Sequence, residues 1–162
     1  MIEVYDNFLD HEDHLWINNF VKESQYFYGQ VDDEQDENSI PTGVTSGIDL
    51  DRRAPTLLDS AIQSKTTVST LYRAYINMFS PGEISNFHVD DHRKNTYTGL
   101  YYANTEKWNH QEGGETQFLI NNEIYGILPI PNRMVVFDSR LLHKATPFHR
   151  RHRWTIALKY AD

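Results

Sequence analysis

The sequence predicts a mainly β protein with flanking helices (α+β), in which N-terminal helices pack on one sheet of a jelly roll. Two stretches with helical periodicity precede Thr66, and the rest of the chain consists of short segments rich in β-branched and aromatic residues. Helices followed by a run of short strands favour a double-sheet β structure with helices on one face, of which the jelly roll is a common form. A length of 162 residues suffices for one core, so we expect a single domain over residues 1–162.

Two helices are expected before the strands. Asp10 is a favourable N-cap for the first helix, with Asp13 three residues on, and Pro55 lies in the first turn of the second, where proline is well tolerated. The apolar positions that define the two stripes are Leu15, Ile17, Phe20 and Val21 in the first helix and Leu57, Leu58, Ala61 and Ile62 in the second.

Six strands are expected in the second part of the chain. They cover residues 68–79, 97–103, 116–120, 124–128, 134–138 and 154–160. Ser80-Pro81-Gly82 ends the first of them, and Gly113-Gly114 interrupts the chain before the third. Asn121-Asn122 predicts a two-residue hairpin turn between the third and the fourth.

The net charge of −8 is unevenly distributed. Residues 1–81 hold 14 acids and 5 bases, whereas residues 82–162 hold 9 acids and 10 bases. An acidic chain argues against general affinity for nucleic acid, which depends on basic contacts to phosphate. The stretch 140–159 contains six bases and no acid, which predicts a site for a small anion; a solvated strand edge is the alternative. Residues 32–38 include five acids and predict a solvated, mobile loop, or else a feature that attracts a basic substrate.

Composition also limits the compartment. The chain has no cysteine, which excludes disulfides and thiolate metal sites. No apolar run approaches the ~18 residues of a membrane span, and the acidic N-terminus lacks the features of a signal peptide. We therefore expect a cytoplasmic protein without a membrane partner.

Four residues of the second half form a recognisable set of metal ligands and an anion partner. His88 and Asp90 are separated by one residue, so in an extended segment both side chains point to the same face. His143 can complete a set of two imidazoles and one carboxylate, which is the ligand set of non-heme Fe(II) oxygenases and leaves coordination positions open. Arg153, ten residues further on, can pair with a distant carboxylate of a co-substrate.

The histidine-x-acid pattern is not specific by itself, because the chain contains it three times. His11 and Asp13 lie at the expected helix start, where a carboxylate is favourable, and His110 lies in a loop before a pair of glycines. Taken singly, His143 is a core or surface histidine and Arg153 belongs to a solvated run of bases. The surroundings of His88 are what distinguish it.

These surroundings form a series of motifs in a fixed order. The motifs are Phe79-Ser80-Pro81-Gly82, Phe87-His88-Val89-Asp90, Leu100-Tyr101-Tyr102, Gly113-Gly114-Glu115-Thr116, Met134-Val135-Val136-Phe137, His143-Lys144-Ala145-Thr146-Pro147 and Arg153-Trp154-Thr155-Ile156-Ala157. In order and spacing, the series resembles the 2-oxoglutarate- and Fe(II)-dependent dioxygenases of the prolyl 4-hydroxylase type. The resemblance covers roughly residues 70–160.

The resemblance implies a double-stranded β-helix, which is a jelly-roll variant, and a catalytic metal site. His88, Asp90 and His143 would bind Fe(II), and Arg153 would pair with the far carboxylate of 2-oxoglutarate. Its planar guanidinium matches a carboxylate better than lysine does. O2 is the second co-substrate, and ascorbate is included as an accessory reductant.

Further co-substrate contacts follow from the same resemblance. Tyr102 and Thr155 are expected to offer hydroxyls to the carboxylate held by Arg153. Relatives often carry a tyrosine where this chain has Phe79, which has no hydrogen-bond donor. That contact is therefore missing or is supplied by Tyr75 on the same strand face.

The expected reaction is hydroxylation of an aliphatic C–H bond, with release of succinate and CO2. A prolyl residue or another amino-acid side chain is the leading substrate, so a peptide, a protein or a small amino acid is the expected partner. Arg93, Lys94 and Trp108 are expected near the mouth of the site as substrate contacts. The oligomeric state is not predicted.

Two alternatives remain open at the level of sequence. One is a nucleic-acid dealkylase on the same scaffold, although such enzymes carry a second arginine six residues after the first, where this chain has Lys159. The other is a metal-binding jelly roll without oxygenase activity.

Overall fold

A computed structural model describes residues 1–31 and 35–162. Within these ranges it contains two helices and nine strands, in the order β1 (Ile2–Tyr5), α1 (His11–Glu23), β2 (Val44–Gly47), α2 (Arg53–Gln63), β3 (Thr70–Phe79), β4 (Tyr97–Tyr102), β5 (Thr116–Ile120), β6 (Glu123–Ile127), β7 (Met134–Asp138), β8 (His143–Ala145) and β9 (Arg153–Ala161). Of the acidic stretch 32–38, residues 32–34 lie outside the described residues, and residues 35–38 are exposed.

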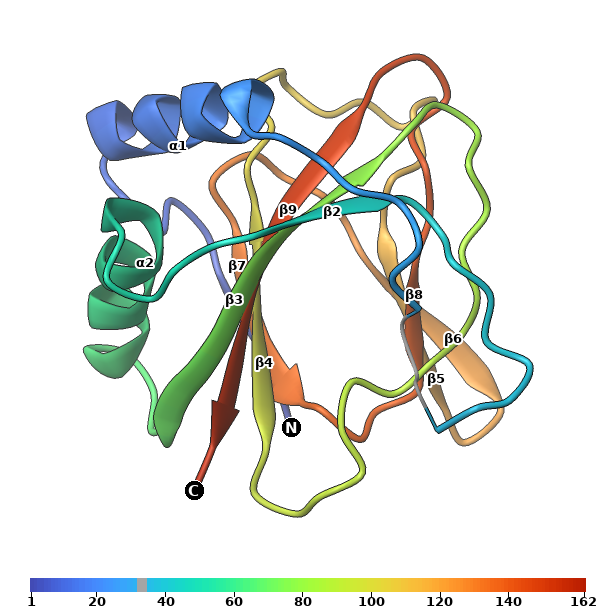
Figure 1. The fold of residues 1–162 in the computed structure, drawn as a ribbon. Coiled ribbons are helices and arrows are strands. Elements are labelled where there is room, and N and C mark those ends of the chain that lie inside the picture. The colour runs from blue at the N-terminus through green and yellow to red at the C-terminus, as the bar shows by residue number, and fades with distance from the viewer. Residues whose placement is uncertain (32–34) are drawn as a thin grey trace.

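The strands form two antiparallel sheets. The larger has the order β1-β7-β4-β9-β3-β2 and the smaller the order β6-β5-β8. Both helices lie on one side of the larger sheet, and the smaller sheet lies on its other side (Figure 1). The expectation of a mainly β protein with helices on one sheet of a jelly roll is confirmed.

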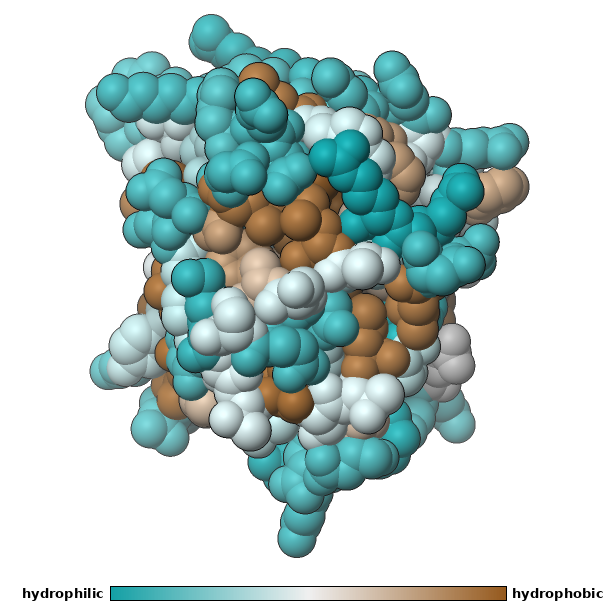
Figure 2. Space-filling view, turned by 90° about the vertical axis from the view of Figure 1, so that its left-hand side faces the viewer, coloured by the Kyte–Doolittle hydropathy of each residue, from teal (hydrophilic) through white to brown (hydrophobic). Residues whose placement is uncertain are grey.

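The two faces of the larger sheet differ in what they bury. Toward the helices, Ile76 and Leu158 belong to an apolar core that includes Ile17 and Leu58 from α1 and α2. A second, smaller apolar cluster lies toward the other sheet and includes Phe118. On the outer side of the helices, hydrophilic side chains surround a group of apolar side chains near the middle of the face (Figure 2).

The helices begin as the sequence predicts. The Asp10 carboxylate accepts a hydrogen bond of 2.9 Å from the Asp13 backbone N–H, which satisfies one of the free donors of the first turn. Pro55 lies in the first turn of α2. Neither helix of the described ranges is long and apolar enough to cross a membrane.

Six strands match their expected positions, and three others escaped prediction. Asn121 and Asn122 both have positive φ, 52° and 64°, as the predicted tight hairpin between β5 and β6 requires. The missed strands β1, β2 and β8 have only three or four residues each, which is too few to show an alternating pattern. They are strands because they pair with β7, β3 and β5, respectively.

Candidate metal and co-substrate site

The three expected metal ligands meet between the two sheets. His88, Asp90 and His143 each direct one ligand atom into a group whose members lie within 4.8 Å of one another. The Asp90 carboxylate lies 3.5 Å from the Nε2 atom of His88 through Oδ1 and 3.5 Å from that of His143 through Oδ2. Two imidazoles and one carboxylate at this spacing fit a single divalent cation, as in the facial sites of non-heme iron enzymes.

Backbone pairing holds the two histidines in place. His88 and His143 exchange N–H to C=O hydrogen bonds of 2.9 Å each, which places their rings 4.5 Å apart. The Nδ1 atom of His88 lies 3.0 Å from the Asn86 carbonyl, and that of His143 lies 2.8 Å from the Leu141 carbonyl. A carbonyl accepts from a protonated Nδ1, so this tautomer directs the Nε2 atom of each ring toward Asp90, as a metal ligand requires.

The electrostatics favour the ligating forms of both residue types. Burial lowers the pKa of His143 to about 4, although Asp90 opposes the shift, so the imidazole is neutral. Burial would raise the pKa of Asp90, but the Lys159 ammonium beside it holds this pKa well below its usual value. Metal binding requires a neutral imidazole and an ionised carboxylate, and the site provides both.

Arg153 is a buried cation at the other end of the same inner face. Its side chain is only 1% exposed, yet no carboxylate in the described part of the chain pairs with it. Its Nε donates to the Gly114 carbonyl and its Nη2 to the Thr116 hydroxyl, both at 2.9 Å, and its guanidinium lies 5.3 Å from the centre of the Tyr102 ring. Burial lowers the pKa of Arg153. A charge held this way is costly unless an anion joins it.

Thr155 supplies a second sign of a ligand. Its buried hydroxyl has no hydrogen-bond partner among the described residues, and the side chain lines the same cavity as Arg153. A buried polar atom without a partner is uncommon in a native protein and calls for an explanation. An anionic group beside Arg153 would give this hydroxyl an acceptor, so the residues present fit a carboxylate co-substrate.

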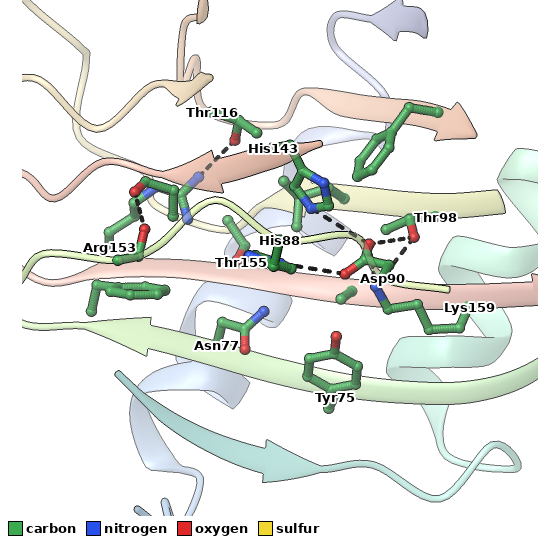
Figure 3. A pocket seen from close by; sticks show the side chains of 16 residues that line it. Tyr75, Asn77, His88, Asp90, Thr98, Thr116, His143, Arg153, Thr155 and Lys159 are labelled. Atoms are coloured by element: carbon green, nitrogen blue, oxygen red, sulfur yellow. Dashed lines mark hydrogen bonds and ion pairs between the residues drawn. The ribbon is translucent and has the colours of Figure 1, made fainter. Parts of the chain in front are cut away.

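The metal ligands and the anion site belong to one cavity. The cavity has a volume of about 40 Å³ and is lined by all three metal ligands together with Arg153 and Thr155. Arg153 lies at one end, Lys159 and Tyr75 lie at the other, and Thr155 lies between them (Figure 3). The candidate metal ligands and the candidate anion partner Arg153 therefore face the same cavity.

The model of the family described as the 2OG-Fe(II) oxygenase superfamily matches residues 74–160, which contain every residue of this site. The chain belongs to the 2OG-Fe(II) oxygenase superfamily. The family implies Fe(II) and 2-oxoglutarate as metal and co-substrate. A search of curated protein sequences finds no match.

Solved structures of this superfamily share the fold. A prolyl hydroxylase from Trichoplax adhaerens, in complex with a peptide fragment of hypoxia inducible factor, is 24% identical with a TM-score of 0.79, over 99% of this chain and 83% of that one. A prolyl-4-hydroxylase from Pseudomonas putida is 15% identical with a TM-score of 0.69, over 98% and 91% of the two chains. A viral collagen prolyl hydroxylase from Paramecium Bursaria Chlorella virus-1 is 14% identical with a TM-score of 0.66, over 99% and 96%.

These matches confirm the double-stranded β-helix. The family model confirms that the protein is a 2-oxoglutarate- and Fe(II)-dependent oxygenase.

The remaining predicted co-substrate residues fall at different places in this oxygenase. The Tyr102 hydroxyl lies 2.6 Å from the Thr116 hydroxyl, which in turn accepts from Arg153, but Tyr102 is not among the residues that line the cavity, so its contact with the co-substrate stays a prediction. The Tyr75 ring instead lies 5.6 Å from the Lys159 ammonium, at the end of the cavity away from Arg153. Phe79 is the cross-strand partner of Arg153. Tyr75 lines the same cavity but lies away from Arg153, and its contact with the co-substrate stays a prediction.

The predicted substrate contacts lie outside the cavity. Arg93 is exposed and pairs with Asp91, with an Nη2 to Oδ2 distance of 2.7 Å, and its neighbour Lys94 is exposed. Trp108 donates from Nε1 to the Gly113 carbonyl at 2.9 Å, within its own loop. None of the three is among the residues that line the metal cavity. Their role in substrate binding stays a prediction.

Sequence reasoning missed two polar residues that touch Asp90. The Thr98 hydroxyl donates to Asp90 Oδ2 at 2.6 Å, and the Lys159 ammonium pairs with the same oxygen. A signal for Lys159 was available, because residues 153, 155, 157 and 159 of a strand share one face. Thr98 had no comparable signal, since it looks like any β-branched strand residue.

Proposed function

We propose that the protein hydroxylates an aliphatic C–H bond of a prolyl residue or another amino-acid side chain, with release of succinate and CO2. One observation supports this most directly. One cavity contains both a group of two imidazoles and one carboxylate and, at a different position, the buried Arg153. Among the described residues, Arg153 has no carboxylate partner. This pair of features matches the two ends of a chelating dicarboxylate. We also propose that residues 1–162 act as one domain of this kind.

In this proposal each residue has a distinct task. His88, Asp90 and His143 hold Fe(II), and Arg153 and Thr155 bind the far carboxylate of 2-oxoglutarate. The bound iron supplies the oxidative chemistry, in which O2 and 2-oxoglutarate are consumed as the substrate is hydroxylated. The carbonyl of Gly114 keeps the guanidinium aimed along the cavity, since it fixes Nε. Apolar side chains around the cavity limit the entry of water, which strengthens every charge interaction inside it.

The substrate class rests on the relatives and on a second cavity. The Trichoplax enzyme is a prolyl hydroxylase in complex with a peptide, and the Pseudomonas enzyme is a prolyl-4-hydroxylase. In this chain a cavity of about 240 Å³ adjoins the metal cavity and shares Tyr75, Asn77, Asp90 and Lys159 with it. Many of its lining residues are polar, which suits a peptide or an amino acid with hydrogen-bonding groups.

The dealkylase alternative has less support. Lys159 occupies the position of the second arginine of those enzymes, but it is 5% exposed and pairs with Asp90. The net charge of −8 also opposes binding to a phosphate backbone. We expect no DNA binding at physiological salt. Micromolar binding that weakens steeply with salt, together with formaldehyde release from a methylated base, would establish the alternative instead.

The first experiment is an anaerobic titration of the protein with Fe(II) and then 2-oxoglutarate. A metal-to-ligand charge-transfer band in the wild type, absent in His143→Ala, is the expected result. Succinate formation in air should then rise when proline-containing peptides or free amino acids are supplied. The absence of both the band and succinate formation would exclude an oxygenase and leave the metal-binding jelly roll. Ascorbate enters this assay only as a reductant, and its requirement stays a prediction.

A further inference from the structure

We propose that Lys159 is a positioning residue that engages one oxygen of Asp90, so that the carboxylate binds the metal through its other oxygen only. The proposal depends on the function proposed above, because it assumes that Asp90 is a metal ligand. Neither the family match nor the similar structures assign a role to this lysine.

The contacts around Asp90 are asymmetric. Oδ2 accepts from the Thr98 hydroxyl at 2.6 Å and from the Lys159 ammonium, whose Nζ also lies 3.2 Å from the Thr98 hydroxyl oxygen. Oδ1 lies 3.5 Å from Nε2 of His88 and Oδ2 lies 3.5 Å from Nε2 of His143, so the two donors on Oδ2 are what distinguish the two oxygens. A carboxylate oxygen that already accepts two hydrogen bonds is a poorer metal ligand than its neighbour. Oδ1 is therefore the atom left for the metal.

The fold fixes Lys159 at this position. On β9 it pairs with Thr98 of β4 on one side and with Arg73 of β3 on the other, in the middle of the larger sheet. Its side chain is 5% exposed, and its ammonium lies 5.6 Å from the centre of the Tyr75 ring. A buried ammonium has little freedom to leave its partners, because it would lose all compensation for its desolvation.

Asp90 is fixed from the backbone side as well. Its N–H donates to the Ser139 carbonyl at 2.9 Å, and the Ser139 hydroxyl lies 3.0 Å from that of Thr98. Backbone and side chain together allow the carboxylate one orientation. A carboxylate that binds through one oxygen occupies one coordination position, and so the positions that a chelating co-substrate and O2 require stay open.

Lys159 has two opposite effects on metal affinity, and their signs can be tested. Its positive charge repels a divalent cation, so a lysine that serves only as a counter-ion would weaken metal binding. Its hydrogen bond orients Asp90, and groups that orient a ligand typically contribute about 10- to 100-fold in metal affinity or activity. We infer that orientation dominates, so removal of Lys159 should weaken metal binding even though it removes a positive charge.

The experiment measures Co(II) binding to the purified protein by calorimetry and by the visible absorption of the bound ion. Lys159→Met keeps most of the side-chain volume and should bind Co(II) about 10- to 100-fold more weakly than wild type, with an altered absorption spectrum. Thr98→Val removes the other donor without a change of charge and should shift affinity in the same direction. Arg73→Met is the matched control, because Arg73 is the cross-strand neighbour of Lys159 and carries an equal charge. The guanidinium of Arg73 lies against the Tyr75 ring. The affinity of Arg73→Met should stay within about twofold of wild type.

The outcomes distinguish a failure of the positioning role of Lys159 from a failure of the proposed function. Co(II) affinity of Lys159→Met that equals or exceeds that of wild type would overturn the positioning role while leaving the metal site intact. Failure of the wild type itself to bind Co(II) would overturn the proposed function instead. Circular dichroism shows whether Lys159→Met folds, and if it does not, Thr98→Val decides the question. An unchanged affinity and spectrum in Thr98→Val would then count against the inference.

Discussion

Replacement of Arg153 by methionine should weaken 2-oxoglutarate binding while leaving the free protein close to its original stability. The substitution removes the charge and keeps most of the volume. In the complex, the variant loses a desolvated charge pair with the co-substrate carboxylate, and loss of one member of such a pair costs about 2–5 kcal/mol. At 1.4 kcal/mol for each factor of ten, this corresponds to an increase in Kd of about 30-fold to about 4,000-fold.

The free protein should respond differently to the same change. Arg153 is 1% exposed and donates hydrogen bonds to the Gly114 carbonyl and the Thr116 hydroxyl. The loss of these bonds destabilises the variant, whereas removal of a buried charge without a counter-ion stabilises it. The two effects oppose each other, so we expect the free energy of unfolding to stay within about 2 kcal/mol of wild type.

The assay for affinity is the anaerobic charge-transfer titration at saturating Fe(II), and the assay for stability is urea unfolding without co-substrate. Arg151→Met is the matched control, because Arg151 is a neighbouring base that already pairs with Glu112 at 2.7 Å and with Glu106 at 3.1 Å. Its Kd for 2-oxoglutarate should not change. A Kd for Arg153→Met within about twofold of wild type would refute the assignment of the anion site.

Three further perturbations test other parts of the site and the fold. Asp90→Ala should abolish metal binding and turnover. In urea unfolding it should also destabilise the protein by about 3–5 kcal/mol, because Lys159 is left buried without its partner. Unchanged stability would show that the lysine is not desolvated. Gly114→Ala places a methyl group 2.3 Å from the Phe148 ring, at a residue with a φ of +87°. It should therefore lower the free energy of unfolding by about 1–3 kcal/mol. It should also weaken 2-oxoglutarate binding, measured by the anaerobic charge-transfer titration. Burial lowers the pKa of His14, so the unfolded chain binds this proton more readily than the folded one, and the free protein should lose stability as the pH falls below about 6.5. His14→Gln should flatten the melting temperature between pH 7 and pH 5, and parallel curves for the two proteins would contradict this role.

Local features of the sequence were enough to place much of the fold. The N-cap at Asp10, the strand of residues 116–120 and the Asn121-Asn122 turn are set by interactions within a few residues, so their sequence signals are complete in themselves. The metal ligands were also within reach, because a one-residue spacing places His88 and Asp90 on one face of an extended segment. The structure then brings His143 to them.

Other features depended on residues far apart in the chain. The three-residue strand β8 exists because His143 to Ala145 pairs with β5, and no pattern so short identifies a strand. The position of Tyr75 beside Lys159 is set by the register of β3 against β9, which places Tyr75 opposite Ala157, four residues from Arg153.

The amino-acid sequence by itself determined which side chains could do oxygenase chemistry, because ligand type and the spacing of His88 and Asp90 are local properties. Only the tertiary structure decided how those side chains are supported. The pairing of Lys159 with Asp90 joins residues 69 positions apart, and the bond from Arg153 to the Gly114 carbonyl spans 39. Such contacts depend on the order and register of strands in two sheets, which are fixed by the packing of the whole core rather than by any segment of the chain.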